Sequence, residues 1–217
     1  MIELRASKSE VTFRAASPGS NSPGTIVGYP SKFNTKSHVL GERGPGSVGR
    51  AFREKVHPYA FARSLKSDAD VVCNMDHDTS KILGRRRNKT LDLFTDDKGL
   101  LMRCVLPATS MGRDAAALIA RGDCSEMSFA FTPDEDSWDE EDACSCDNED
   151  CTGCSNGVRM KMPVRTLKSV SLKDVAVLTG SPAYPKTAVS MVNDREGMDF
   201  VFYNSLPPSM PMEMWRA

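Results

Sequence analysis

The chain has 217 residues, a length at which one domain with a good hydrophobic core is expected and two full domains would be crowded. Hydrophobic residues make up 40% and charged residues 26%, as in ordinary globular proteins. Lysine and arginine number 28 against 29 acidic residues, and this net charge of -1 provides no general attraction to nucleic acid or anionic lipid. We therefore expect neither a nucleic-acid partner nor a membrane partner.

We expect the protein to be soluble and unexported. No segment approaches the roughly 20 apolar residues that span a bilayer, and residues 1–16 lack the apolar region of a secretion signal. Seven cysteines in such a chain indicate reduced thiols or a metal site more than disulfide bonds.

Taken in chain order, the local patterns alternate between strands and a few helices. Residues 1–24 are rich in Ser, Gly and Pro and are predicted to be flexible after a possible first strand. The patterns then predict a strand ending in a turn at Pro30, a helix over 52–65, a strand over 70–75, a hairpin over 90–107, a helix over 111–123, and strands over 125–133, 158–167 and 171–180. The expected fold is α+β and mostly β, with a barrel-like core and the helices packed outside it.

Two segments differ in composition from the rest. Residues 134–150 contain ten acids and no base, and they lead into four closely spaced cysteines, so 134–157 is predicted to be an acidic, cysteine-rich insertion. Residues 193–217 are rich in Met and Pro and are predicted to form a tail without a core of its own.

The chain contains three histidines, and only His77 lies between carboxylates at the end of an expected strand, in NMDHD. His38 lies in a glycine-rich loop, and His57 precedes Pro58 on the expected helix. A histidine that a neighbouring acceptor holds in one tautomer can act as a general base. His77 is therefore the candidate base, although nearby acids also make structural histidines common.

Ser128 lies in the expected strand SEMSFAF. Strand alternation places Met127, Phe129 and Phe131 on one face and Ser128 with Ala130 on the other. The apolar face would anchor the strand, and the small neighbour would leave room for a substrate carbonyl beside the hydroxyl. A serine on a solvated strand face shows the same pattern, so Ser128 is a candidate only as part of a set.

Six motifs follow one another in order through the chain. They are VGYPSKFN, FREKVHPYAF, NMDHD, ILGRRRNKTLDLFTDDKGLLMRCVLPATS, IARGDCSEMSFAFTP and LKDVAVLTGSPAYPKTAV. As an ordered series they resemble the prohead maturation proteases of tailed bacteriophages, which share the fold and the His-then-Ser order of the herpesvirus assemblins. The resemblance covers residues 25–192, and only the cysteine-rich segment is foreign to the pattern.

This resemblance implies an assemblin-like prohead protease domain over residues 25–192, with Ser128 as nucleophile and His77 as general base. Assemblins use a second histidine after the serine, but this chain has none beyond His77. The phage enzymes place an acid before the Pro-Ala-Tyr-Pro turn, and the matching residue here is Asp174 in LKDVAV. Asp76 and Asp78 are alternative acidic partners for His77. The alternative, non-catalytic interpretation of Asp174 is a strand acid that pairs with a lysine.

The resemblance also implies a function and a setting. A serine endopeptidase of this kind needs no cofactor for catalysis. It cleaves scaffold protein, the major capsid precursor and itself inside the viral procapsid in the host cytoplasm, and it can self-associate. Two other classes stay open on the same fold: a catalytically silent capsid scaffold or assembly protein, and a zinc-binding interaction module in which Ser128 is structural.

The cysteine cluster has the spacing C-x-C-x4-C-x2-C, formed by Cys144, Cys146, Cys151 and Cys154. Four thiolates so spaced can surround one tetrahedral metal, for which zinc is the usual structural occupant. The last three also fit the C-x4-C-x2-C run of plant-type iron–sulfur proteins, and a loop without metal is the third alternative. We expect any structural metal in this chain, most simply zinc, to bind there.

Two further groups of residues have simpler explanations. Cys73, Cys104 and Cys124 lie in or beside apolar runs and are predicted to be buried packing residues. The basic run RRRNK over 85–89 lies between strands and lacks interleaved aromatics, so it is predicted to be a solvated turn or a contact for acidic groups.

Overall fold

A computed structural model describes residues 3–7, 12–15, 21–41, 51–142, 154–155, 158–159 and 161–180. Strands dominate these ranges, so the prediction of a mostly β, α+β fold is confirmed. The helices are α1 (Ala62–Lys66) and α2 (Ser110–Arg121). The strands are β1 (Glu3–Ser7), β2 (Thr12–Ala15), β3 (Gly24–Lys32), β4 (Arg53–Val56), β5 (Val72–Met75), β6 (Asp78–Arg85), β7 (Leu91–Thr95), β8 (Gly99–Val105), β9 (Glu126–Asp142), β10 (Cys154–Ser155), β11 (Val158–Arg159) and β12 (Lys161–Leu178).

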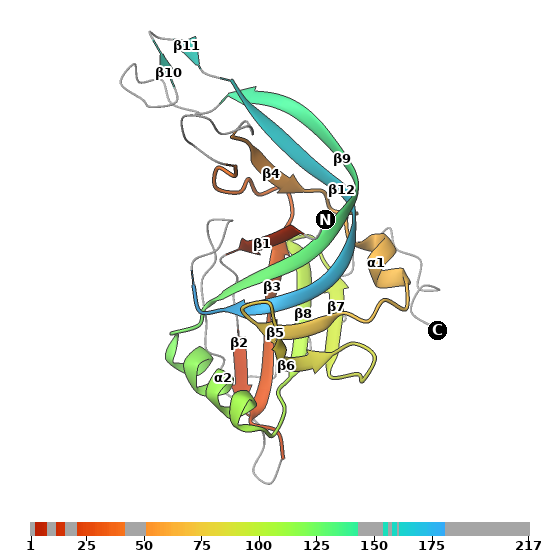
Figure 1. The fold of residues 1–217 in the computed structure, drawn as a ribbon, viewed down its shortest axis with the longest axis vertical. Coiled ribbons are helices and arrows are strands. Elements are labelled where there is room, and N and C mark those ends of the chain that lie inside the picture. The colour runs from red at the N-terminus through yellow and green to blue at the C-terminus, as the bar shows by residue number, and fades with distance from the viewer. Residues whose placement is uncertain are drawn as a thin grey trace.

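The strands form two large sheets and a small ribbon (Figure 1). The six-stranded sheet has the order β1-β9-β12-β5-β6, with β4 also paired to β12, and the four-stranded sheet has the order β2-β3-β8-β7. Strands β9 and β12 are the longest, and they run antiparallel to each other along the molecule towards the β10-β11 ribbon (Figure 1). The other strands of the larger sheet are joined through this pair, since β1 pairs with β9, and β4 and β5 pair with β12.

The hydrophobic core lies between the two large sheets. Alternate residues of β9 point into it, and the Phe129 ring stacks on Phe131 with centroids 5.1 Å apart and meets Phe61 edge-on at 5.5 Å. The Sγ of Cys73 on β5 lies 4.0 Å from the Sδ of Met102 on β8, so side chains of the two sheets are in contact. The predicted inward face of β9 is thus confirmed.

Several predicted elements are present. Helix α2 begins after Thr109, whose hydroxyl accepts a hydrogen bond from the Gly112 N–H at 3.2 Å, and it ends at Gly122 with a left-handed φ of 83°. The predicted hairpin is β7 and β8. In the RRRNK run, Arg85 ends β6 and residues 86–89 form a turn, and Arg85 and Arg87 pair with Asp70.

The predicted helix over 52–65 is wrong for its first half. Residues Arg53–Val56 form β4, which pairs in parallel with Val164–Leu167 of β12, and only Ala62–Lys66 are α-helical. The apolar spacing resembled a helix, but burial of Glu54 and Val56 on alternate positions follows a strand period. Strand β3 also continues past Pro30 where a turn was expected, and its register shifts between Gly28 and Ser31.

The acidic stretch from Asp134 to Asp142 continues β9 and pairs with the start of β12. Most of the predicted insertion beyond it lies outside the described residues, and so does the predicted tail over 193–217. Within the described ranges, no helix is both long enough and apolar enough to cross a membrane.

Arg165 on β12 ties four strands of the larger sheet together. Its guanidinium donates to Asp136 on β9 at 2.6 Å, to Glu3 on β1 at 2.9 and 3.1 Å, and to Glu54 on β4 at 3.3 Å. Burial works against its charge, but hydrogen bonds to Asp136 and Glu3 raise the pKa of Arg165 above its ordinary value. Arg165 therefore stays charged, and it compensates the fully buried Glu54.

We predict that Arg165→Ala destabilises the fold strongly, because it removes at once the guanidinium that binds Asp136, Glu3 and the buried Glu54. The expected loss is about 3–5 kcal/mol in the free energy of urea unfolding. Lys161→Ala is the matched control, since the Lys161–Asp142 ion pair also links β12 to β9 but is exposed. That variant should lose less than about 1 kcal/mol. Equal losses in the two variants would contradict this role of Arg165.

Candidate active site

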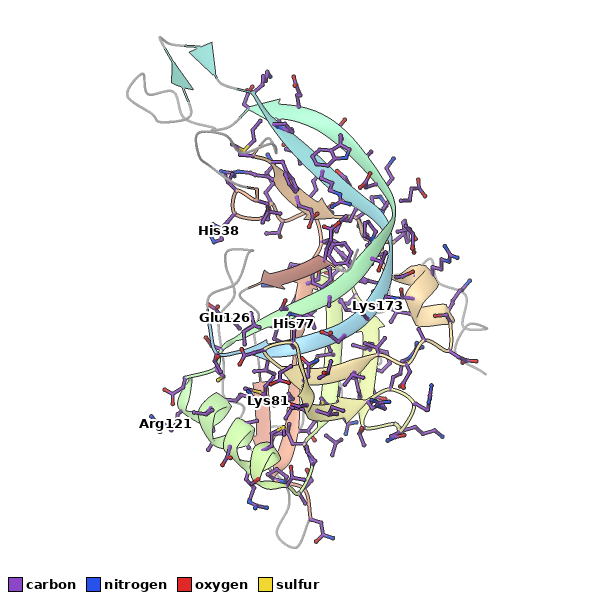
Figure 2. All side chains as sticks on the ribbon, in the orientation of Figure 1. His38, His77, Lys81, Arg121, Glu126 and Lys173 are labelled. Atoms are coloured by element: carbon purple, nitrogen blue, oxygen red, sulfur yellow. The ribbon has the colours of Figure 1, made fainter. Side chains whose placement is uncertain are left out.

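His77 lies in a two-residue hairpin turn between β5 and β6. Met75 pairs with Asp78, and the two residues between them, Asp76 and His77, have φ values of 51° and 59°. Tight hairpins that match the strand twist need positive φ at both central positions, which aspartate and histidine tolerate better than branched residues. The sequence NMDHD therefore turns sharply and presents the imidazole beside the sheet (Figure 2).

Asp76 fastens this turn to the end of β12. Its N–H donates to the Val177 carbonyl at 2.9 Å. Its carboxylate accepts from the Thr179 N–H at 2.8 Å and from the Thr179 hydroxyl at 2.9 and 3.0 Å. The position of His77 is thereby coupled to the strand that carries Asp174.

A β-bulge in β12 decides where Asp174 points. Leu172 pairs with Phe131 and Asp174 pairs with Ala130, so Lys173 is an extra residue without its own partner on β9. Leu172 is buried in the core, and so are Val175 and Val177 on the other side of the bulge. Because the bulge reverses the alternation, Asp174 leaves the face of Leu172 and joins that of Ser128 and Ala130.

The three side chains form a continuous chain of hydrogen bonds. His77 Nε2 lies 2.6 Å from Ser128 Oγ, and His77 Nδ1 lies 2.6 Å from Asp174 Oδ1. A carboxylate only accepts hydrogen bonds, so Nδ1 carries the proton and Nε2 is left to accept from the serine hydroxyl. The imidazole and the carboxylate are only 11% and 18% exposed, which limits competition from water for these bonds.

Two alanines lie directly across the strand pair from Ser128 and Asp174. Ala176 lies opposite Ser128 in register, and Ala130 lies opposite Asp174, so all four residues share one face of the sheet. Both alanines are fully buried. Neither Ala176 nor Thr179 was predicted from the sequence. The signal for Ala176 is a small residue on each of two strands, and it can be recognised only when their register is known.

The other candidates for the site lie elsewhere. Asp78 accepts from the Ser80 hydroxyl at 2.6 Å and from its N–H at 2.9 Å, and these bonds lower the pKa of Asp78. The Nδ1 of His57 accepts from the Tyr59 N–H. Among the acids considered as partners of His77 in the described residues, Asp174 is the one that bonds to it.

The predicted burial of Cys73, Cys104 and Cys124 is confirmed, and their thiols are free. A hydrogen bond with Cys104 and burial raise the pKa of Cys73, and burial raises that of Cys124, so both stay protonated. In the part of the chain that the structure describes, no group of three His, Cys, Asp or Glu side chains could hold a metal. Cys144, Cys146, Cys151 and the side chain of Cys154 lie outside that part, so the zinc site stays a prediction.

A serine hydroxyl bonded to an imidazole that is itself bonded to a carboxylate is an arrangement capable of nucleophilic catalysis. A comparison with protein families matches residues 9–199 to the Caudovirus prohead serine proteases. The chain belongs to this family, which supports a protease role in phage capsid maturation and confirms the resemblance drawn from the motifs. Comparisons with curated proteins and with solved structures gave no match.

We predict that the Asp76 carboxylate protects the Thr179 amide from hydrogen exchange. Asp76→Gly keeps the positive φ but removes the acceptor, so exchange at Thr179 should accelerate by about tenfold or more, because hydrogen bonds to charged groups are worth about 1.5–3 kcal/mol. Asp76→Asn retains one acceptor oxygen without the charge, so it should accelerate exchange less than Asp76→Gly does. Asp78→Ala is the matched control on the other side of His77 and should leave the rate unaltered. Equal exchange rates at the Thr179 amide in all three variants would show that the Asp76 carboxylate does not protect it.

Proposed function

We propose that this chain is a serine endopeptidase in which Ser128 is the nucleophile, His77 the general base and Asp174 the acid that orients His77. The observation that carries the proposal is the pair of 2.6 Å contacts, which link Ser128 Oγ through both imidazole nitrogens to Asp174. Membership of a serine protease family supports it independently.

Acylation follows from the direction of these hydrogen bonds. As Ser128 Oγ attacks the scissile carbonyl carbon, its proton passes to His77 Nε2, and Asp174 stabilises the imidazolium through Nδ1–H. The tetrahedral intermediate then collapses, the C–N bond breaks, and His77 returns the proton to the leaving amine. The product is an acyl-enzyme on Ser128.

Deacylation repeats the same steps with water. His77 takes a proton from water as the water oxygen attacks the ester carbonyl, and it then returns that proton to Ser128 Oγ. Backbone N–H groups are the usual donors to the oxyanion in both halves of such reactions. No cofactor takes part in this route.

The proposed substrates are the scaffold protein, the major capsid precursor and the protease chain itself, inside the procapsid. Family membership supports this choice. A protease that digests scaffold must not act before the shell has assembled. Confinement in a closed particle provides that delay, because it raises the effective concentration of enzyme and substrate towards the millimolar range.

We predict that Ser128→Ala and His77→Ala each lower the rate of precursor cleavage by about a million-fold. Ser128 and His77 act together to form the acyl-enzyme, so loss of either one removes that route. Asp174→Asn should cost about ten-thousand-fold, since it leaves the imidazole in place but favours the wrong tautomer. The measurement is cleavage of purified capsid precursor at high enzyme concentration, with cut sites mapped by mass spectrometry.

Matched controls separate these losses from unfolding. Ser171→Ala alters a serine of β12 that bonds Asp134, and His57→Ala alters a histidine outside the site. Both should cleave within about twofold of the unmodified chain, and all variants should keep the same Tm within a few degrees. Cleavage by Ser128→Ala at the rate of the unmodified chain would remove Ser128 from the mechanism. Metal binding without any cleavage would instead favour the interaction module.

A further inference from the structure

The Ser128 hydroxyl is covered in this structure, since the residue is only 1% exposed. Its imidazole partner comes from the β5–β6 turn. In the order of the sheet, β12, β5 and β6 all lie on one side of β9. The imidazole therefore closes that side of the hydroxyl, and a scissile carbonyl has to approach from elsewhere.

The opposite side of Ser128 is taken by β1. This strand is the end of the sheet order and runs antiparallel to β9, with Ala6 directly opposite Ser128. The pairing extends from Glu3 opposite Phe131 to Ser7 opposite Met127. Without β1, β9 would be an edge strand, and its free backbone groups beside Ser128 would be available to an extended peptide.

Among the described residues, the interactions that hold β1 in place include its backbone pairing with β9 and the ion pair between Glu3 and Arg165. The strand is short, and short edge strands open more easily than central ones. Its Glu3 carboxylate is bound by Arg165, but Arg165 also holds Asp136 and Glu54. Departure of Glu3 therefore leaves the guanidinium with two carboxylates and leaves the β4–β9–β12 connection intact.

We propose that β1 is an internal occupant of the substrate-binding edge of β9, and that an extended substrate segment replaces it beside Ser128. The inference rests on the proposed function. A tethered strand competes at an effective concentration of about a millimolar, so dilute substrate loses the competition and confined substrate wins it. When only a fraction of the molecules has an open edge, the apparent affinity for substrate falls by that fraction.

The test uses the full chain with Glu3→Lys, which places a second cation against Arg165 and favours release of β1. We expect labelling of Ser128 by a fluorophosphonate probe to accelerate at least about fivefold, and KM for a precursor peptide to fall with kcat unchanged. Glu135→Lys, which reverses an exposed acid of β9, is the matched control and should label at the rate of the unmodified chain. A synthetic peptide of residues 1–7 at millimolar concentration should slow labelling of the Glu3→Lys variant.

A second variant lacking residues 1–7 should label faster still, with its folding checked by thermal denaturation. If this variant does not fold, the comparison of Glu3→Lys with Glu135→Lys decides whether release of β1 speeds labelling of Ser128. Equal labelling of Glu3→Lys, Glu135→Lys and the unmodified chain would overturn the role of β1 while leaving the proposed catalysis standing. Failure of every folded variant to label or to cleave precursor would instead overturn the proposed function.

Discussion

The antiparallel pairing of β9 with β12 is the constraint on which the rest of this structure depends. It sets Ala176 opposite Ser128 and Ala130 opposite Asp174, and one extra residue at Lys173 decides which face Asp174 occupies. If β12 ran without that bulge, Asp174 would point into the core beside Leu172, where an uncompensated carboxylate is expensive to bury. The hydrogen-bond chain to His77 and the apolar core are therefore products of the same register.

The sequence predicted those parts of the fold that follow from local chemistry. The alternation of Met127, Phe129 and Phe131 identified the inward face of β9, and Gly122 marked the end of α2 because a left-handed residue is needed there. Residues 52–65 were misassigned because their apolar spacing fits a helical period locally, while pairing with β12 overrides it from a distance. No local pattern carries that information.

The candidate site divides in the same way. The motif series indicated His77, Ser128 and Asp174, and the structure brings their side chains within hydrogen-bonding distance of one another. The bulge at Lys173, the positions of Ala130 and Ala176 opposite Asp174 and Ser128, and the hydrogen bonds between Asp76 and Thr179 each depend on the alignment of segments that are distant along the chain. A bulge is a shift of one residue in pairing, and LKDVAV reads as an ordinary strand until its partner is known.

The protease assignment and the position of β1 together give a physical reason for delayed activity. Ser128, the proposed nucleophile, is buried, and β1 pairs with β9 beside it. Under our proposal, activity requires a substrate segment to replace β1 at that edge. Such an exchange depends on the concentration of substrate, which confinement in a closed capsid shell raises. Timing would then follow from mass action, without a separate activating factor.

The most direct measurement is made on assembled particles. The protease, scaffold protein and capsid precursor are co-expressed, and the procapsids are purified and their proteins sized by mass spectrometry, with Ser128→Ala compared against Ser171→Ala. Catalysis by Ser128 predicts full-length scaffold and capsid precursor in the Ser128→Ala particles and trimmed products in the Ser171→Ala particles. Trimmed precursors in the Ser128→Ala particles would contradict the central claim.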